Sequence, residues 1–258
     1  MFEFHLDKDR YFQMQETNCR EHVIPFIQQH HLLGKGVRVL EIGCSEAGVL
    51  KAFLDEGCEC VGVELNEDSL KRGEERMSGY IQSGQLKLIA RDIYKINLEK
   101  DFESKFDVIV LKDVIEHIID QKKLIVWMKS FLNPGGVIFF GFPPWQMPFG
   151  GHQQVMNSKF LSRLPYFHLL PMPIYKWVLR KEPGSNHFIE IKQTGISIER
   201  FEKIVKETGY QIVGKTHYLI NPIYQYKFNL KGRKQLGLVS AIPVVRNFFT
   251  TCVFYLIK

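Results

Sequence analysis

The feature that most constrains this chain is a strand, a turn and a helix encoded by residues 37–54. The apolar run 37–42 includes Glu41, small residues fill the turn Gly43-Cys44-Ser45-Glu46-Ala47-Gly48, and apolar residues then recur with helical spacing. Small side chains let the backbone of such a turn approach a ligand closely. A second apolar strand ends at Glu64, 23 residues after Glu41, where an acid can accept both hydroxyls of a ribose. The two strands predict a site for a nucleoside-containing cofactor.

Apolar strands and helical patterns alternate through the first half of the chain. Continuous apolar runs with helices between them are typical of a parallel sheet covered on both faces. A helical pattern precedes the first strand at 10–33, and a helix at 197–209 and strands at 210–220 and 248–257 close the chain. The predicted central strands are 37–42, 60–64, 86–90, 106–111 and 136–141, and the predicted helices between them are 47–56, 66–78 and 118–132.

Regular alternation stops after Phe142. Residues 143–195 hold seven of the eleven prolines and many aromatic residues, which is typical of a lid or binding cap. We therefore predict four parts: an N-terminal helical segment (1–34), a cofactor-binding α/β core (35–142), a substrate cap (143–195) and a C-terminal helix with the last two strands (196–258).

Charge is unevenly distributed along the chain. Residues 1–150 carry 18 Lys and Arg against 23 Asp and Glu, whereas residues 151–258 carry 16 against 5. This asymmetry predicts either an anionic ligand for the second part or simply a solvated basic surface. The N-terminus lacks a basic start followed by an apolar core, and the five cysteines form no metal-binding pattern. We expect reduced thiols, a cytoplasmic location and no transmembrane segment.

Two further strand ends carry chemistry-bearing residues. Asp92 and Ile93 follow the third strand, where a carboxylate can accept a hydrogen bond from an adenine amino group. The fourth strand ends in Lys112 and Asp113, beside the point where open α/β sheets bind their ligands.

With these motifs the chain resembles a class I S-adenosylmethionine-dependent methyltransferase, close to the quinone-biosynthesis-like group. The matching pieces occur in family order over residues 37–141. They are Val39-Leu40-Glu41-Ile42-Gly43-Cys44, Val63-Glu64, Asp92, Phe106-Asp107-Val108, Val114-Ile115-Glu116-His117 and Leu132-Asn133-Pro134-Gly135-Gly136. The resemblance implies an α/β, doubly wound Rossmann-like sheet of seven strands, mostly parallel with a reversed last strand, plus an irregular cap.

The resemblance also assigns the cofactor, S-adenosyl-L-methionine, with S-adenosyl-L-homocysteine as product. Glu41, Gly43, Cys44, Ser45 and Gly48 would surround the methionine part. The remaining predicted contacts are Glu64 and Leu65 at the ribose, Asp92 and Ile93 at the adenine, and Lys112 and Asp113 beside the sulfonium.

The chain departs from the family at Ser45 and Ala47, where glycine is common. We expect the pocket to survive, because both replacements are small, and the backbone there to adopt φ angles that suit residues other than glycine.

The methyl acceptor is predicted less directly. His152 follows Gly150-Gly151, a candidate hinge, and could take the proton of an oxygen nucleophile or simply bond to the backbone. Glu116 and His117 are expected to be structural, and no metal site is predicted. The basic cluster of Lys227, Lys231, Arg233 and Lys234 could hold a phosphate or carboxylate.

We therefore predict O-methylation of a small or medium, anionic acceptor, such as a glycan or lipid precursor. Nucleic acid is not expected as a partner, since no nucleic-acid-binding motif accompanies the basic cluster. The proline-rich segment 161–179 could pack on the core or contact a membrane surface. Two alternatives remain: a nicotinamide-dependent oxidoreductase that uses the same turn, and a cofactor-binding module without activity.

Overall fold

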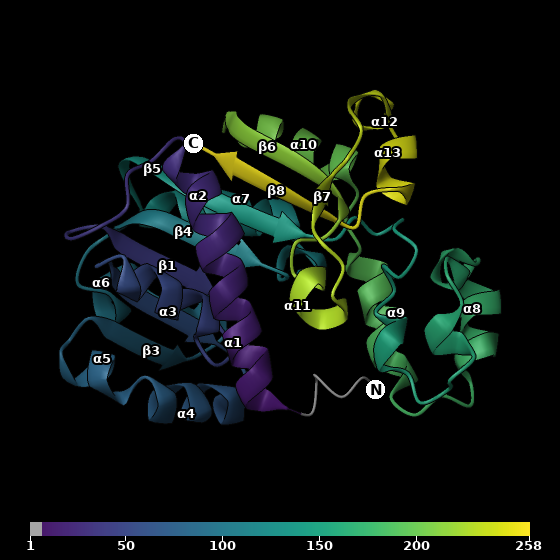
Figure 1. The fold of residues 1–258 in the computed structure, drawn as a ribbon, viewed down its shortest axis with the longest axis horizontal. Coiled ribbons are helices and arrows are strands. Elements are labelled where there is room, and N and C mark those ends of the chain that lie inside the picture. The colour runs from purple at the N-terminus through teal and green to yellow at the C-terminus, as the bar shows by residue number, and fades with distance from the viewer. Residues whose placement is uncertain (1–6) are drawn as a thin grey trace.

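One mixed sheet organises the chain, for which a computed structural model describes residues 7–258. The sheet has eight strands in the order β3-β2-β1-β4-β5-β8-β6-β7 (Figure 1). The strands are β1 (Arg38–Ile42), β2 (Glu59–Glu64), β3 (Leu86–Ala90), β4 (Phe106–Lys112), β5 (Leu132–Phe142), β6 (Ile212–Ile220), β7 (Arg233–Lys234) and β8 (Cys252–Ile257). The predicted α/β class is confirmed, with eight strands instead of seven.

The direction of the strands follows the prediction. Strands β1 to β5 are parallel, and β8 inserts antiparallel between β5 and β6. The additional strand, β7, pairs antiparallel with β6 through two residues. A two-residue strand is too short to leave an apolar run in the sequence.

Helices cover both faces of the sheet, as alternate side chains of the central strands require. Leu40 and Ile42 of β1 pack with apolar residues of α7 and α10, whereas Val39 packs on the opposite face with residues of α2 and α3. The helices around the sheet are α1 (Lys8–Asn18), α2 (Ile24–Gln28), α3 (Gly48–Asp55), α4 (Glu67–Arg76), α5 (Ser78–Gln82), α6 (Leu98–Asp101), α7 (Gln121–Met128) and α10 (Ile198–Glu207).

The predicted N-terminal helix divides into three pieces. A π-helical turn (Cys19–Val23) separates α1 from α2, in which Pro25 occupies the first turn. Proline lacks an N–H and is tolerated at the start of a helix, which explains the break. Helix α1 packs on α3 so closely that a Cβ on Gly48 would lie 2.9 Å from the carbonyl oxygen of Phe12.

The segment after β5 is more helical than predicted. It contains α8 (Met172–Leu179), α9 (Ser185–Thr194) and short 3₁₀ turns, beside the main sheet (Figure 1). Buried side chains that include Phe167, Tyr175 and Phe188 give it an apolar core of its own. Among the helices of residues 7–258, none combines the length and apolarity that a membrane crossing requires.

The last part of the chain carries an insertion between β6 and β8. It contains α11 (Tyr224–Phe228), β7, α12 (Gly237–Ala241) and α13 (Val245–Phe248). The predicted strand at 248–257 therefore begins only at Cys252. The positions of α11 and of the segment after β5 matter most below, because both border the same cavity.

Candidate active site

A cavity of about 160 Å³ lies where β1 and β4 end, beneath α1. Seven of the predicted cofactor residues line it: Glu41, Gly43, Cys44, Ser45, Gly48, Lys112 and Asp113. Tyr11, Phe12 and Gln15 of α1 form part of its wall, a contribution that no pattern in the sequence predicted. We call this space the strand-end cavity.

Glu41 is a buried acid with an unused hydrogen-bonding atom at this cavity. Its side chain is 2% exposed, and the oxygen Oε2 has no hydrogen-bond partner. Burial raises the pKa of Glu41 well above its usual range, and nearby Lys112 opposes the shift only in part. The positive charge of an ammonium group would favour the ionised form of Glu41, so this acid is suited to pair with the ammonium group of a methionine-like ligand.

The turn after β1 is held in a strained conformation. Gly43 has φ +75°, and a Cβ there would lie 2.6 Å from Cγ2 of Val114. Ser45 and Ala47 also have positive φ, at 50° and 65°. The expectation that these two positions would adopt φ angles suited to non-glycine residues is therefore wrong. Such strain persists where the surrounding structure enforces it, commonly at ligand sites.

The acid at the end of β2 is oriented by the same turn. Glu64 accepts hydrogen bonds from the backbone N–H of Ser45 (2.9 Å) and of Asn66 (2.8 Å). The next residue, Leu65, is 73% exposed. Neither residue lines the strand-end cavity, so their predicted contact with a ribose stays a prediction.

Asp92 and Ile93 follow β3, the neighbour of β2 in the sheet. Asp92 caps a short 3₁₀ turn (Ile93–Lys95) by accepting a hydrogen bond from the N–H of Tyr94 at 3.0 Å. Ile93 is buried in the core. Because β2 and β3 are paired, Glu64 and Asp92 lie at the same edge of the sheet, as the prediction of a shared adenosine site requires.

Lys112 and Asp113 complete the edge of the strand-end cavity. Lys112 donates to Asp113 Oδ2 at 2.7 Å and to Gln15 Oε1 at 2.8 Å. Burial alone would raise the pKa of Asp113, but the charge and hydrogen bond of Lys112, together with the charge of Lys227, outweigh it and hold this pKa below its usual value. Asp113 is therefore an anion, suitably placed to face a cationic ligand group.

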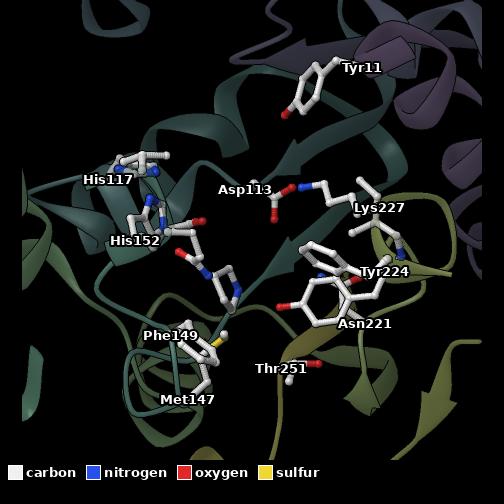
Figure 2. Close-up of a pocket in the computed structure, with 16 residues that line it drawn as sticks. Tyr11, Asp113, His117, Met147, Phe149, His152, Asn221, Tyr224, Lys227 and Thr251 are labelled. Carbon is white, nitrogen blue, oxygen red and sulfur yellow. Dashed lines mark hydrogen bonds between the residues drawn. The ribbon is translucent and has the colours of Figure 1, made fainter. Parts of the chain in front are cut away.

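A second cavity, of about 310 Å³, adjoins the first and shares Tyr11 and Asp113 with it. We call it the cap cavity, because residues of the segment after β5 form one wall (Figure 2). Figure 2 shows Asp113 between His117 and His152 on one side and Lys227 and Tyr224 on the other. Its lining is Tyr11, Asp113, Glu116, His117, Pro143, Met147, Phe149, His152, Gln154, Val155, Asn221, Ile223, Tyr224, Lys227, Phe228 and Thr251.

His152 enters the cap cavity, where it meets His117. The two rings have centroids 4.9 Å apart and cross at 77°. Burial, with a contribution from His117, lowers the pKa of His152 to about 3, and burial also lowers the pKa of His117. Both imidazoles are therefore neutral near neutral pH, with nitrogen lone pairs free to accept a proton or a cation.

The two glycines before His152 are explained by close packing. A Cβ on Gly150 would lie 2.2 Å from the carbonyl oxygen of Trp145, and one on Gly151 would lie 2.4 Å from Cβ of His168. These contacts account for both glycines without a hinge. They fix the backbone that carries His152, which itself has φ 54°.

The opposite wall comes from the insertion between β6 and β8. Lys227 of α11 lines the cap cavity, and burial lowers its pKa to about 8, against the opposing charge of Asp113. Of the predicted basic cluster, only Lys227 reaches this cavity. Lys231, Arg233 and Lys234 are exposed and do not line it.

The sequence assigned Glu116 and His117 a structural role and predicted no metal site. The structure brings Glu116, His117 and His152 together, with one candidate ligand atom from each within 4.8 Å of the others. The motif at 113–117 already contained two of these candidate ligands, Glu116 and His117, but only the fold shows that His152, from the segment after β5, lies beside them.

Comparison with known proteins identifies the family of the chain. A family model described as a methyltransferase domain matches residues 13–214. The chain is 24% identical over 209 residues to a ubiquinone biosynthesis O-methyltransferase of Bordetella avium, covering 80% of this chain and 75% of that protein. It is 27% identical over 152 residues to the protein of that name from Leptothrix cholodnii, covering 59% of this chain and little more than half (56%) of the relative.

Solved structures support the fold. An S-adenosylmethionine-dependent methyltransferase from Clostridium acetobutylicum aligns over 99% of this chain and 97% of that chain, with TM-score 0.60 and 15% identity. Magnesium protoporphyrin IX methyltransferase from Synechocystis, solved with bound S-adenosylhomocysteine, aligns over 98% of this chain and 86% of that chain, with TM-score 0.54 and 13% identity. The predicted family resemblance is confirmed.

Proposed function

Because the chain belongs to the methyltransferase-domain family, we propose that it transfers the methyl group of S-adenosylmethionine to an oxygen of a small or medium, anionic acceptor. The observation that carries this proposal is the pair of adjoining cavities that share Tyr11 and Asp113. A cofactor in the strand-end cavity and an acceptor in the cap cavity would meet at these two residues. In-line transfer needs that arrangement, since positioning supplies much of the rate.

The residues at the strand-end cavity fit the cofactor. Glu41 offers a buried oxygen without a partner to the ammonium group, and Gly43 lets the backbone turn at the cavity wall, where a Cβ would clash with Val114. Asp113 brings negative charge to the place where the cavities meet, which favours a positively charged sulfur. The bound cofactor supplies an already activated methyl group.

An oxygen nucleophile must also lose its proton. In our proposal the acceptor hydroxyl points toward His152, whose neutral imidazole can accept a hydrogen bond from it. Because the pKa of His152 is lowered to about 3, the imidazole is a weak base, and its main contribution is to orient the hydroxyl. The names of the relatives, which are O-methyltransferases, favour oxygen over nitrogen or carbon as the methylated atom.

Lys227 supports an anionic acceptor, because it brings a positive charge to the wall of the cap cavity opposite His152 (Figure 2). The proposed acceptor carries a phosphate or carboxylate on the side away from its reacting hydroxyl. A lipid precursor also fits the apolar part of the wall, to which Met147, Phe149 and Val155 contribute.

Two measurements test the proposed activity. Calorimetry should detect S-adenosylhomocysteine binding at one site per chain, with no competition from NAD. Incubation with methyl-labelled S-adenosylmethionine and a panel of hydroxylated phosphates and carboxylates should transfer label to an acceptor. Preference for NAD would favour the oxidoreductase alternative, and cofactor binding without transfer to any acceptor would favour a binding module.

A matched pair of variants tests the anionic acceptor. Lys227→Met removes a charge from the cap cavity, whereas Lys231→Met removes one from the exposed surface nearby. A charge-assisted hydrogen bond contributes about 1.5–3 kcal/mol, so Lys227→Met should raise the acceptor KM roughly 10- to 100-fold. Lys231→Met should leave KM unchanged. Equal effects of the two variants would refute the role of Lys227.

A further inference from the structure

The cap cavity contains a buried acid whose charge no protein group balances by a hydrogen bond. Glu116 is 4% exposed, and neither carboxylate oxygen has a hydrogen-bond partner. Lys112, the basic residue at the end of β4, is already engaged by Asp113 and Gln15. A buried carboxylate without a partner is costly, so this position calls for either a proton or a cation.

Two imidazoles face the same point. Single ligand atoms of Glu116, His117 and His152 all lie within 4.8 Å of one another. Glu116 and His117 belong to the turn Ile115–His117 after β4, and His152 precedes the turn Gln153–Val155. Ligands of a tetrahedral zinc ion are about 3.3 Å apart at Zn–N distances near 2.0–2.1 Å. Small side-chain rotations would therefore close the set around an ion.

We propose that Glu116, His117 and His152 bind a divalent transition-metal cation in the cap cavity. Two imidazoles and a carboxylate favour zinc, cobalt, iron or manganese over calcium or magnesium, which prefer all-oxygen sites. Three protein ligands leave at least one coordination position open, as in catalytic rather than structural sites. All three residues line the cavity, so that position faces the proposed acceptor.

The cation would change how the acceptor hydroxyl is activated. This consequence rests on the proposed methyl transfer, whereas the binding of the cation does not. A hydroxyl oxygen bound to the cation loses its proton to a cavity water at lower pH than a free hydroxyl does. The resulting oxyanion forms the O–C bond, the S–C bond breaks, and its electron pair stays on sulfur. His152 then acts as a ligand, and no histidine base is needed.

Metal binding can be measured without any acceptor. Protein stripped with a chelator should take up one zinc or cobalt ion per chain, detected by calorimetry and by the visible absorption of bound cobalt. Glu116→Gln and His152→Ala should each weaken binding at least about a hundredfold, since losing even outer partners of a metal ligand costs 10- to 100-fold. His187→Ala is the control, because His187 is an exposed histidine of the same segment outside the cluster.

The outcomes separate this proposal from the proposed function. Absence of stoichiometric binding, or binding unaffected by both Glu116→Gln and His152→Ala, would overturn the metal site and leave Glu116 as a buried neutral acid. Binding of S-adenosylhomocysteine by each variant verifies folding, since none of the three cluster residues lines the strand-end cavity. Methyl transfer at full rate by chelator-treated protein would refute the role in activation alone. Failure of the native protein to bind S-adenosylhomocysteine would refute the proposed function and leave the metal site untouched.

Discussion

Two buried glutamates at the strand-end cavity should respond oppositely to the same substitution. Glu41 has an oxygen without a partner, whereas Glu46, also at the cavity, pairs with Arg72 at 2.6 Å and Arg76 at 3.2 Å. Glutamine keeps the shape of each side chain and removes its charge. The cofactor-free protein should therefore gain stability from Glu41→Gln and lose it from Glu46→Gln.

The magnitudes follow from burial and pairing. Glutamine is also a buried polar group, so the gain comes from the ionisation of Glu41 alone. Each unit by which burial raises the pKa of Glu41 costs the folded state about 1.4 kcal/mol at neutral pH, a cost that neutral glutamine avoids. Glu41→Gln should therefore raise the free energy of unfolding by at least about 1 kcal/mol. For a chain of this size, each kcal/mol gained in the free energy of unfolding raises Tm by about 2–4 °C. Glu46→Gln should lower the free energy of unfolding by about 1–2 kcal/mol, because it removes the ion pairs with Arg72 and Arg76. The loss is limited because both arginines are partly exposed and regain some hydration.

The gain from Glu41→Gln should also depend on pH. Burial raises the pKa of Glu41 in the folded state, so folding favours its protonated form. The contribution of Glu41 to stability is therefore fully present below its unfolded pKa, near 4.3, and is lost as pH rises through the folded value. The stability difference between Glu41→Gln and the native protein should grow with pH across this window.

Cofactor affinity provides the second readout. If Glu41 pairs with the ammonium group, Glu41→Gln should weaken S-adenosylhomocysteine binding roughly 10- to 100-fold, for a charge-assisted bond of about 1.5–3 kcal/mol. Chemical unfolding of the cofactor-free protein measures the change in stability, and calorimetric titration with S-adenosylhomocysteine measures the change in affinity. Glu46→Gln is measured in parallel in both experiments. Lower stability of Glu41→Gln at neutral pH, or unchanged cofactor affinity, would refute the reasoning.

Three other predictions concern the turn and the cap cavity. Gly43→Ala should reduce both stability and cofactor affinity, because the added Cβ would clash with Val114. Gly36→Ala is the control in the same assays: Gly36 also has a positive φ, but no atom lies where its Cβ would be, so this variant measures the cost of the φ angle alone. Ser45→Gly should stabilise the protein by about 0.5–1 kcal/mol in urea unfolding, because the relief of left-handed backbone strain exceeds the entropy cost of glycine. The control, Ala52→Gly inside α3, should destabilise the protein, since no such strain is relieved there. The KM of an anionic acceptor should rise as pH increases through about 8, where Lys227 loses its proton, and a flat KM from pH 7 to 9 would contradict this expectation.

The residues that line the strand-end cavity were predictable because their signals are local in sequence. Glu41, Gly43 and Ser45 occupy one turn, and the parallel order of the strands follows from uninterrupted apolar runs. The φ angles at Ser45 and Ala47 were not predictable from residue type, since packing overrides the intrinsic preference of these residues. Tyr11 and Gln15 were missed because α1 is mostly polar and has no strong apolar face that would indicate which sheet edge it covers.

The cap cavity joins segments that are distant in sequence. Glu116 follows β4, His152 follows β5, and Lys227 lies between β6 and β8, so no local pattern relates them. The charge asymmetry of the chain did indicate a basic second part, but only Lys227 of that cluster lines the cavity. Which positive charges face a ligand depends on the insertion that carries α11, and its length and turns leave no periodic signal.

Strain in the backbone gathers where the two cavities approach each other. Ser45, Asp113 and His152 all have positive φ and line one or both cavities. At Asp113 the surrounding structure enforces this conformation, because its N–H donates to the carbonyl oxygen of Gly141 at 2.7 Å and its carboxylate pairs with Lys112. Methyl transfer depends on the position of a few atoms, to within a fraction of an ångström. In the proposed reaction, the locked conformation of Asp113 would give that precision at the place where the two cavities meet.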